Sequence, residues 1–151
     1  MKIYDIKLSF SLVREDATVK NLCEPYQVAD YIRDAFSANP EQESVWVILL
    51  DTRGKPKGRQ MITLGTATAS LAHPREVFRA AVMSSAAAII IAHNHPSGNP
   101  TPSFADDNLT QQIKSSGRIL GIDLLDHIII GTKEDDPAGL GHYSYRLAGK
   151  V

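Results

Sequence analysis

The sequence contains a single cysteine, Cys23, which excludes an internal disulfide and any zinc cluster built from cysteines. No apolar run is long enough to span a bilayer, and the first five residues lack the apolar core of a secretory signal. An excess of one charge is also absent, because 16 basic and 17 acidic residues give a net charge of -1. With that balance, the chain as a whole lacks the excess positive charge that favours binding to nucleic acid. We therefore expect a cytoplasmic protein without membrane contact.

The 151 residues are enough for one domain with a substantial core. Apolar and β-branched runs alternate with stretches of helical periodicity, and no repeat or low-complexity tract interrupts them. Strands are expected over residues 3–13, 45–50, 59–65, 87–92, 124–130 and 143–147, and helices over residues 25–36, 74–83 and 103–116, the last closed by Gly117. The chain is thus predicted to be a single α/β domain with a mixed sheet, in which the second and third strands form a hairpin.

The segment from His93 to Asp106 carries the densest set of chemically active groups. His93 and His95 follow a buried strand directly, and the period of 2 along a strand places both imidazoles on one face. Proline and glycine then form a shaped loop that ends at Ser103, where a helix begins with Asp106 in its first turn. Two imidazoles and one carboxylate with a fourth position left for water are typical of a catalytic zinc site.

Hydrolysis at such a site needs a carboxylate that takes a proton from water and passes it to the leaving group. Glu43 precedes the predicted strand over residues 45–50 and is one candidate; Glu41 is the other. Ser103 stands beside the predicted ligands, where its hydroxyl could stabilise a developing oxyanion.

Each of these residues also has a purely structural interpretation. Ser103 and Asp106 fit a capping box at a helix start, which is compatible with metal binding. His127, next to Asp126 and an isoleucine run, fits a buried, hydrogen-bonded histidine. The same pair could instead support the site from behind the ligands, since ligating imidazoles need a partner on their second nitrogen.

Several of these motifs together resemble the JAMM/MPN+ metalloproteases, and most closely their RadC-like branch. The resemblance rests on a helix start at Pro74-Arg75-Glu76-Val77-Phe78, the loop from His93 to Gly98, Pro102-Ser103 with Asp106, and the strand from Asp126 to Gly131, and it covers residues 40–147. It implies a cytidine-deaminase-like α/β/α sandwich, with residues 41–151 as the JAB/MPN domain and residues 1–40 as a strand and a helix belonging to or packed on its core.

The resemblance further implies one Zn²⁺ per chain, held by His93, His95 and Asp106. It selects Glu43 over Glu41 as the base, and it implies Ser103 as the oxyanion partner. The expected activity is hydrolysis of a peptide or isopeptide amide bond by a zinc-bound water. The expected partner is a peptide or protein substrate, and an exposed edge strand could also support a homo-oligomer.

Two other functions remain open at this stage. RadC-like proteins carry a historical link to DNA repair, so DNA binding or nuclease chemistry is one alternative. The first 40 residues contain no Gly-x-Gly hairpin, and the near-neutral charge gives DNA binding little support. A non-catalytic interaction scaffold is the other alternative, which the presence of every expected ligand disfavours.

Overall fold

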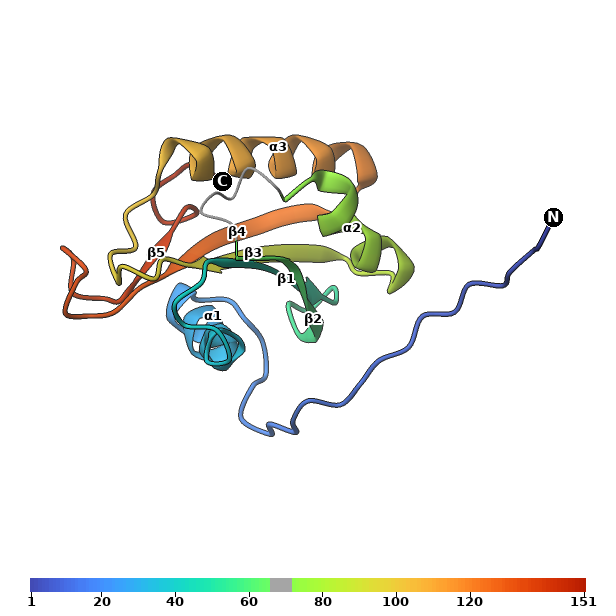
Figure 1. Cartoon of the computed structure of the whole chain (residues 1–151), viewed down its shortest axis with the longest axis horizontal. Helices are drawn as coiled ribbons and strands as arrows, with labels where there is room; N and C mark the ends of the chain where they lie inside the picture. The colour runs from blue at the N-terminus through green and yellow to red at the C-terminus, as the bar shows by residue number, and fades with distance from the viewer. Residues whose placement is uncertain (66–71) are drawn as a thin grey trace.

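A computed structural model describes residues 1–65 and 72–151, and in these residues it contains a five-stranded mixed sheet with helices on both faces (Figure 1). The strands are β1 (Ser44–Leu50), β2 (Pro56–Leu64), β3 (Ala88–Asn94), β4 (Asp123–Ile130) and β5 (His142–Ser144), in the spatial order β2-β1-β3-β4-β5. The helices are α1 (Pro25–Ile32), its short 3₁₀ continuation η1 (Arg33–Phe36), α2 (Pro74–Met83) and α3 (Phe104–Leu120). The predicted α/β sandwich is confirmed.

The central strand β3 is buried along its whole length, which explains its continuous apolar run. Alternate side chains enter different layers of the core. Ile89 and Ile91 pack with apolar residues of α2 and α3, whereas Ile90 and Ala92 pack with those of α1. β3 pairs antiparallel with β1 and parallel with β4, and α3 makes the crossover between β3 and β4. The ends of β3 and β4 and the start of α3 therefore meet at one end of the sheet.

The predicted hairpin of β1 and β2 is confirmed, although β2 begins at Pro56, earlier than expected. The predicted end of α3 is wrong. The helix continues through Gly117 to Leu120 and ends at Gly121, whose φ of 69° is left-handed. Gly117 is needed for close packing instead, because a Cβ there would collide with the carbonyl oxygen of Ile122.

The predicted strand over residues 3–13 is also wrong. Among the residues that the structure describes they have no strand partner, and their apolar side chains are exposed to solvent. Figure 1 shows this segment leaving the body of the protein on the α1 side of the sheet and running outward. The alternation of apolar residues predicted the strand, but a strand also requires a neighbouring edge to pair with.

Asp34 in η1 joins the base of this segment to β2. Its carboxylate accepts hydrogen bonds of 2.6 and 2.8 Å from Arg59 and lies 2.8 Å from Arg14. The Arg59 hydrogen bonds, with a smaller contribution from Arg14, lower the pKa of Asp34 from 3.8 to about 2. Because the folded-state pKa is lowered, the stabilisation is complete above the ordinary pKa and is lost as the pH falls through about 2.

We expect Asp34→Asn to lower the free energy of unfolding at neutral pH and to have a smaller effect as the pH approaches about 2. Urea unfolding of the wild type and the variant at several pH values measures this difference. Asp30→Asn, at an exposed position one helical turn earlier, is the control and should show no such pH dependence. A destabilisation by Asp34→Asn that is independent of pH would contradict the assignment.

Within residues 1–65 and 72–151, no helix combines the length and the apolar character that crossing a bilayer requires.

Candidate metal centre

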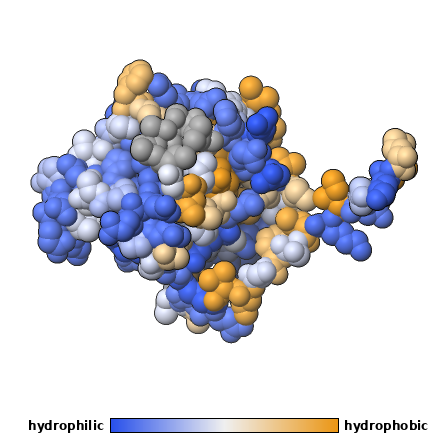
Figure 2. Space-filling view, viewed as in Figure 1, coloured by the Kyte–Doolittle hydropathy of each residue, from blue (hydrophilic) through white to orange (hydrophobic). Residues whose placement is uncertain are grey.

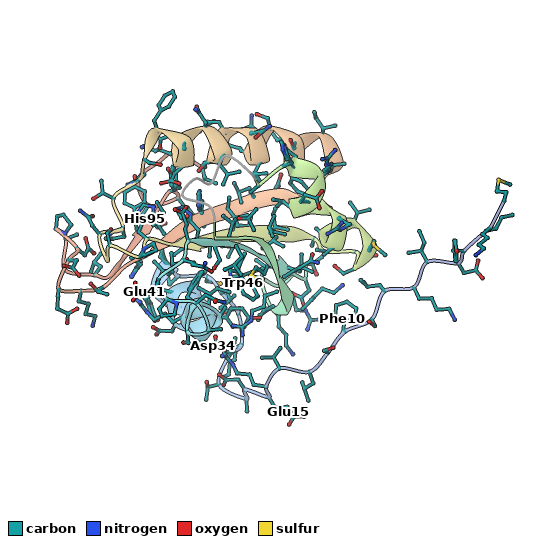
Figure 3. The ribbon with its side chains drawn as sticks, in the orientation of Figure 1. Phe10, Glu15, Asp34, Glu41, Trp46 and His95 are labelled. Carbon is teal, nitrogen blue, oxygen red and sulfur yellow. The ribbon has the colours of Figure 1, made fainter. Side chains whose placement is uncertain are left out.

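Four side chains from three elements meet at the end of the sheet. His93 and His95 come from the end of β3, Asp106 from the first turn of α3, and Glu43 from the residue before β1. One ligand atom from each lies within 4.8 Å of the others. The Nε2 atoms of His93 and His95 are 3.0 Å apart, and they lie 3.1 and 3.3 Å from the two carboxylate oxygens of Asp106. Figure 3 shows His95 at this end of the sheet, far from the end where Phe10 lies.

The loop after β3 is held against the end of β4. The backbone N–H of His95 donates to the carbonyl of Ile130, and that of Thr132 donates to the carbonyl of Gly98. Gly98 has a φ of 87°, which favours glycine. At Gly131 a Cβ would collide with the carbonyl oxygen of Gly98, so only glycine permits this approach. These contacts fix the direction in which His95 leaves the strand.

Asp106 takes part in the helix cap and in the cluster at once. Its Oδ2 accepts a 2.8 Å hydrogen bond from the backbone N–H of Ser103, and its own N–H donates to the Ser103 hydroxyl at 3.2 Å. The predicted capping box is therefore present, while the same carboxylate faces both imidazoles. The positive end of the α3 dipole favours the ionised carboxylate. Ser103 itself is exposed, and its role toward an oxyanion stays a prediction.

The orientation of the His95 ring follows from its second nitrogen. Nδ1 lies 2.8 Å from the carbonyl oxygen of Asn99. A carbonyl oxygen can only accept a hydrogen bond, so Nδ1 carries the hydrogen. In the neutral ring Nε2 is then unprotonated, and its lone pair points into the cluster.

The His93 ring is held by a buried chain of hydrogen bonds. The Thr110 hydroxyl donates to the carbonyl of Asp106 at 2.7 Å and lies 2.6 Å from Nδ1 of His127, whose Nε2 lies 2.8 Å from Nδ1 of His93. With its hydrogen on the carbonyl, the hydroxyl oxygen accepts from His127, which in turn accepts from His93. This assignment leaves Nε2 of His93 unprotonated as well. All four residues are buried.

The donor set fits a metal ion. Two imidazole lone pairs and one carboxylate converge within hydrogen-bonding distance, and lone pairs that face one another repel unless a positive charge lies between them. Neutral imidazoles and a carboxylate are the nitrogen and oxygen ligands that zinc takes at catalytic sites. Because His95 and Glu43 are partly exposed, each with 14% of its side chain accessible, the cluster is open to solvent on one side.

The pKa values of Asp106 and His95 also show that the cluster favours a positive charge at its centre. Burial alone would raise the pKa of Asp106, but the hydrogen bonds with the two imidazoles outweigh it and hold that pKa well below its usual range. Burial also opposes protonation of His95, yet contact with Asp106 and with the Asn99 carbonyl raises the His95 pKa. Both shifts favour positive charge between Asp106 and the imidazoles, which a bound metal ion would supply.

Glu43 lies at the open side of the cluster. Its Oε1 is 3.9 Å from Nε2 of His93, too far for a direct hydrogen bond. Burial raises the pKa of Glu43, partly offset by the nearby imidazoles. Glu41, the other candidate, is exposed and is not part of the cluster. Of the two carboxylates that the sequence offered, the geometry thus favours Glu43.

Asn94 holds the backbone on both sides of Glu43. Its side-chain oxygen accepts a 2.8 Å hydrogen bond from the N–H of Ser44, and its side-chain N–H donates to the carbonyl of Gln42 at 3.0 Å. This role of Asn94 was not predicted from the sequence. Its signal is the position of Asn94 between two histidines, because the period of a strand turns it to the opposite face from them.

The expectations for Asp126 and His127 have different outcomes. His127 lies directly behind His93, and complete burial lowers its pKa well below the ordinary value, so its ring is neutral. Asp126 is placed elsewhere, since alternation along β4 turns it away from the cluster. Its carboxylate accepts hydrogen bonds from the Ser144 hydroxyl and from the N–H groups of His127 and Arg146. These contacts hold the turn that follows β5 against β4. Asp126 therefore contacts the backbone of His127 but none of the four cluster side chains, and its supporting role stays a prediction.

Thr110, which the sequence analysis also missed, gives a test of the hydrogen-bond chain. Thr110→Val removes the hydroxyl and leaves Nδ1 of His127 buried without a partner. We expect the affinity for metal to fall by about 10–100-fold, the usual cost of losing a group that orients a ligand. Thr110→Ser keeps the hydroxyl and is the matched control. Competition with a chelating dye measures both, and equal losses in the two variants would contradict the assigned chain.

Comparison with known proteins identifies related sequences over most of this chain. Residues 22–143 match a family described as RadC-like JAB domain. UPF0758 proteins from Thermotoga maritima and Clostridium perfringens are 43% and 49% identical over 111 and 119 residues, which are 74% and 79% of this chain. A UPF0758 protein from Trichodesmium erythraeum is 54% identical over 93 residues, or 62% of the chain. These matches cover 47%, 52% and 38% of the relatives, so the chain spans about half the length of the first two.

Proposed function

This chain belongs to the RadC-like JAB domain family, and on that premise we propose that it is a zinc-dependent hydrolase that cleaves a peptide or isopeptide bond. The observation that carries the proposal is the convergence of His93, His95, Asp106 and Glu43 within 4.8 Å at a partly open position. The UPF0758 names of the relatives give no activity, so the chemistry of the site is what supports this function.

His93, His95 and Asp106 would hold the ion, and Glu43 would stay outside the set of ligands as the base. A bound zinc ion supplies Lewis acidity, which polarises a substrate carbonyl and makes water acidic enough to be deprotonated near neutral pH. The hydrogen bonds behind the imidazoles would keep both Nε2 lone pairs directed into the cluster, where the ion would be held.

Glu43 supplies the proton transfer. In the ionised form its carboxylate takes a proton from the attacking water as the new bond to the carbonyl carbon forms. The same group then gives this proton to the amide nitrogen as the carbon–nitrogen bond breaks, and it returns to the ionised form. The distance of 3.9 Å from Oε1 to Nε2 of His93 places the carboxylate beside the proposed ligands without a direct hydrogen bond to His93.

Ser103 is our candidate for the oxyanion donor. Its oxygen accepts from the N–H of Asp106, so its hydroxyl hydrogen is free to donate toward a substrate. Its exposed position at the helix start is compatible with contact to a bound carbonyl.

The experiment begins with protein purified without chelator, in which elemental analysis should find about one zinc ion per chain. The protein is then incubated with a peptide library, with isopeptide-linked conjugates, and with single- and double-stranded DNA, each with and without chelator. We expect chelator-sensitive cleavage of an amide bond and no metal-dependent change in DNA. Absence of bound metal, or chelator-sensitive cleavage of DNA alone, would overturn the proposal.

A further inference from the structure

Within residues 1–65 and 72–151, the outer edge of the sheet at β2 is unpaired. Among the described residues β2 pairs with β1 alone, and the strand order places it at the end of the sheet. Its outer backbone groups are therefore available to another strand. Unpaired edges are common pairing sites, which proteins usually protect with charged side chains. Here Arg59 is engaged with Asp34, and the Lys57 ammonium donates to the carbonyl of Ser84. The basic side chains of this strand are thus bound to their own chain.

The N-terminal arm, residues 1–13, has the pattern of a strand without a partner. Ile6, Leu8, Phe10 and Leu12 stand at every second position and would share one face of an extended chain. The exposed fractions of Ile6, Phe10 and Leu12 are 84%, 62% and 78%. Figure 2 shows apolar residues along the arm where it leaves the body. Such a concentration of exposed apolar side chains is typical of an interaction site.

The arm begins beside β2 but does not pair with it. Arg14 fixes its base, with a 3.0 Å hydrogen bond to the carbonyl of Tyr31 and an ion pair to Asp34. The Phe10 ring lies against Gly58, at 3.9 Å from the position that a Cβ would take (Figure 3). A groove of about 660 Å³ separates residues 8–14 from residues 55–60, and no backbone hydrogen bond between the described residues crosses it.

We propose that the arm of one copy of this chain adds as a strand to the β2 edge of a second copy, and that the exchange is reciprocal. The arm starts on the α1 side of its own sheet, where Arg14 anchors it, and its first residues run away from its own β2 edge (Figure 1). The β2 edge of a second copy can therefore lie alongside this arm. Both the arm and the edge belong to every copy, so two copies related by a two-fold axis satisfy both at once.

This pairing leaves the metal centre accessible. The groove lies beside the first half of β2, where Gly58 pairs with Leu49. The metal centre lies at the opposite end of β1, where Ser44 pairs with Leu64. The inferred dimer is therefore independent of the proposed hydrolase activity, and each can fail without the other.

The first test compares two variants of the full chain that add the same charge to opposite faces of the arm. Leu8→Glu combined with Leu12→Glu places the charges on the apolar face, and Ser9→Glu combined with Ser11→Glu places them on the other face. By sedimentation velocity at increasing concentration, we expect the wild type and the serine variant to be dimers. The dissociation constant of the dimer should be at least about a hundredfold higher for the leucine variant than for the wild type.

A second test identifies which copy the arm contacts. A photo-crosslinking amino acid replaces Phe10 in an equal mixture of isotope-labelled and unlabelled protein, and the cross-linked peptides are analysed by mass. Cross-links from the arm to residues 56–60 that join labelled to unlabelled chains support the exchange. A monomeric wild type, a dimer that survives the leucine variant, or cross-links within single chains alone would each overturn it. Circular dichroism and metal content verify that the variants are folded.

Discussion

Replacing His95 with alanine is expected to release the metal from the purified protein while the fold persists. His95 is one of the three proposed ligands, and its loss would leave two donors and the open side of the site. The reduction in affinity should exceed the roughly 10–100-fold that a supporting group contributes. Since 14% of the His95 side chain is exposed and its contacts are polar, removing the ring leaves the apolar core unchanged. Elemental analysis after dialysis measures the metal, and thermal unfolding measures the fold.

The matched control is His73→Ala, because His73 is exposed and, although it is the N-cap residue of α2, its side chain makes no capping hydrogen bond. This variant should retain the metal of the wild type. If His95→Ala still held one equivalent of metal after dialysis, His95 would not be a ligand. A variant that lost both metal and fold would instead indicate that the metal is needed for folding, which refolding with added zinc would test.

Glu43→Gln is expected to keep the metal and to lose hydrolysis. The amide has the shape of the carboxylate but cannot take a proton from water, so the rate should fall by about 10²–10⁴-fold, the usual contribution of a general base. Glu43 is not needed to hold the ion if His93, His95 and Asp106 are the ligands. The measurement compares the single-turnover rate on the best peptide from the library with the metal content of the same sample.

Glu41→Gln serves as the control for this variant, since Glu41 is two residues away, exposed and outside the cluster. It should hydrolyse at the wild-type rate. An unchanged rate in Glu43→Gln would exclude Glu43 as the base, and a loss of metal would make it a ligand instead.

The sequence was enough to predict the elements that carry the site. The strand period predicted that His93 and His95 share one face, and the capping pattern predicted Asp106 in the first turn of a helix. The choice between Glu41 and Glu43 did not follow from these rules, because it depends on the pairing of β1 with β3. The structure favours Glu43 because it lies in the cluster with the two histidines and Asp106, whereas Glu41 is exposed outside it.

Other features depended on tertiary contacts that a pattern does not encode. The alternation over residues 3–13 indicated a strand, but the position of a free edge is a property of the whole sheet. Gly117 looked like a helix end because the close approach of Ile122 to α3 is invisible in the sequence. Thr110 stands four residues after Asp106, on the same helix face. That spacing alone indicates that its hydroxyl lies near the cluster.

Asn94 has a consequence for how substrates enter. It joins the backbone around Glu43 directly to the strand that carries both histidines. In the proposed hydrolase, the base and the ligands would therefore not be separated by a hinge between these two strands. Adaptation would then fall to the substrate, and we expect pliable stretches such as chain termini and linkers to be cleaved in preference to the interior of folded domains.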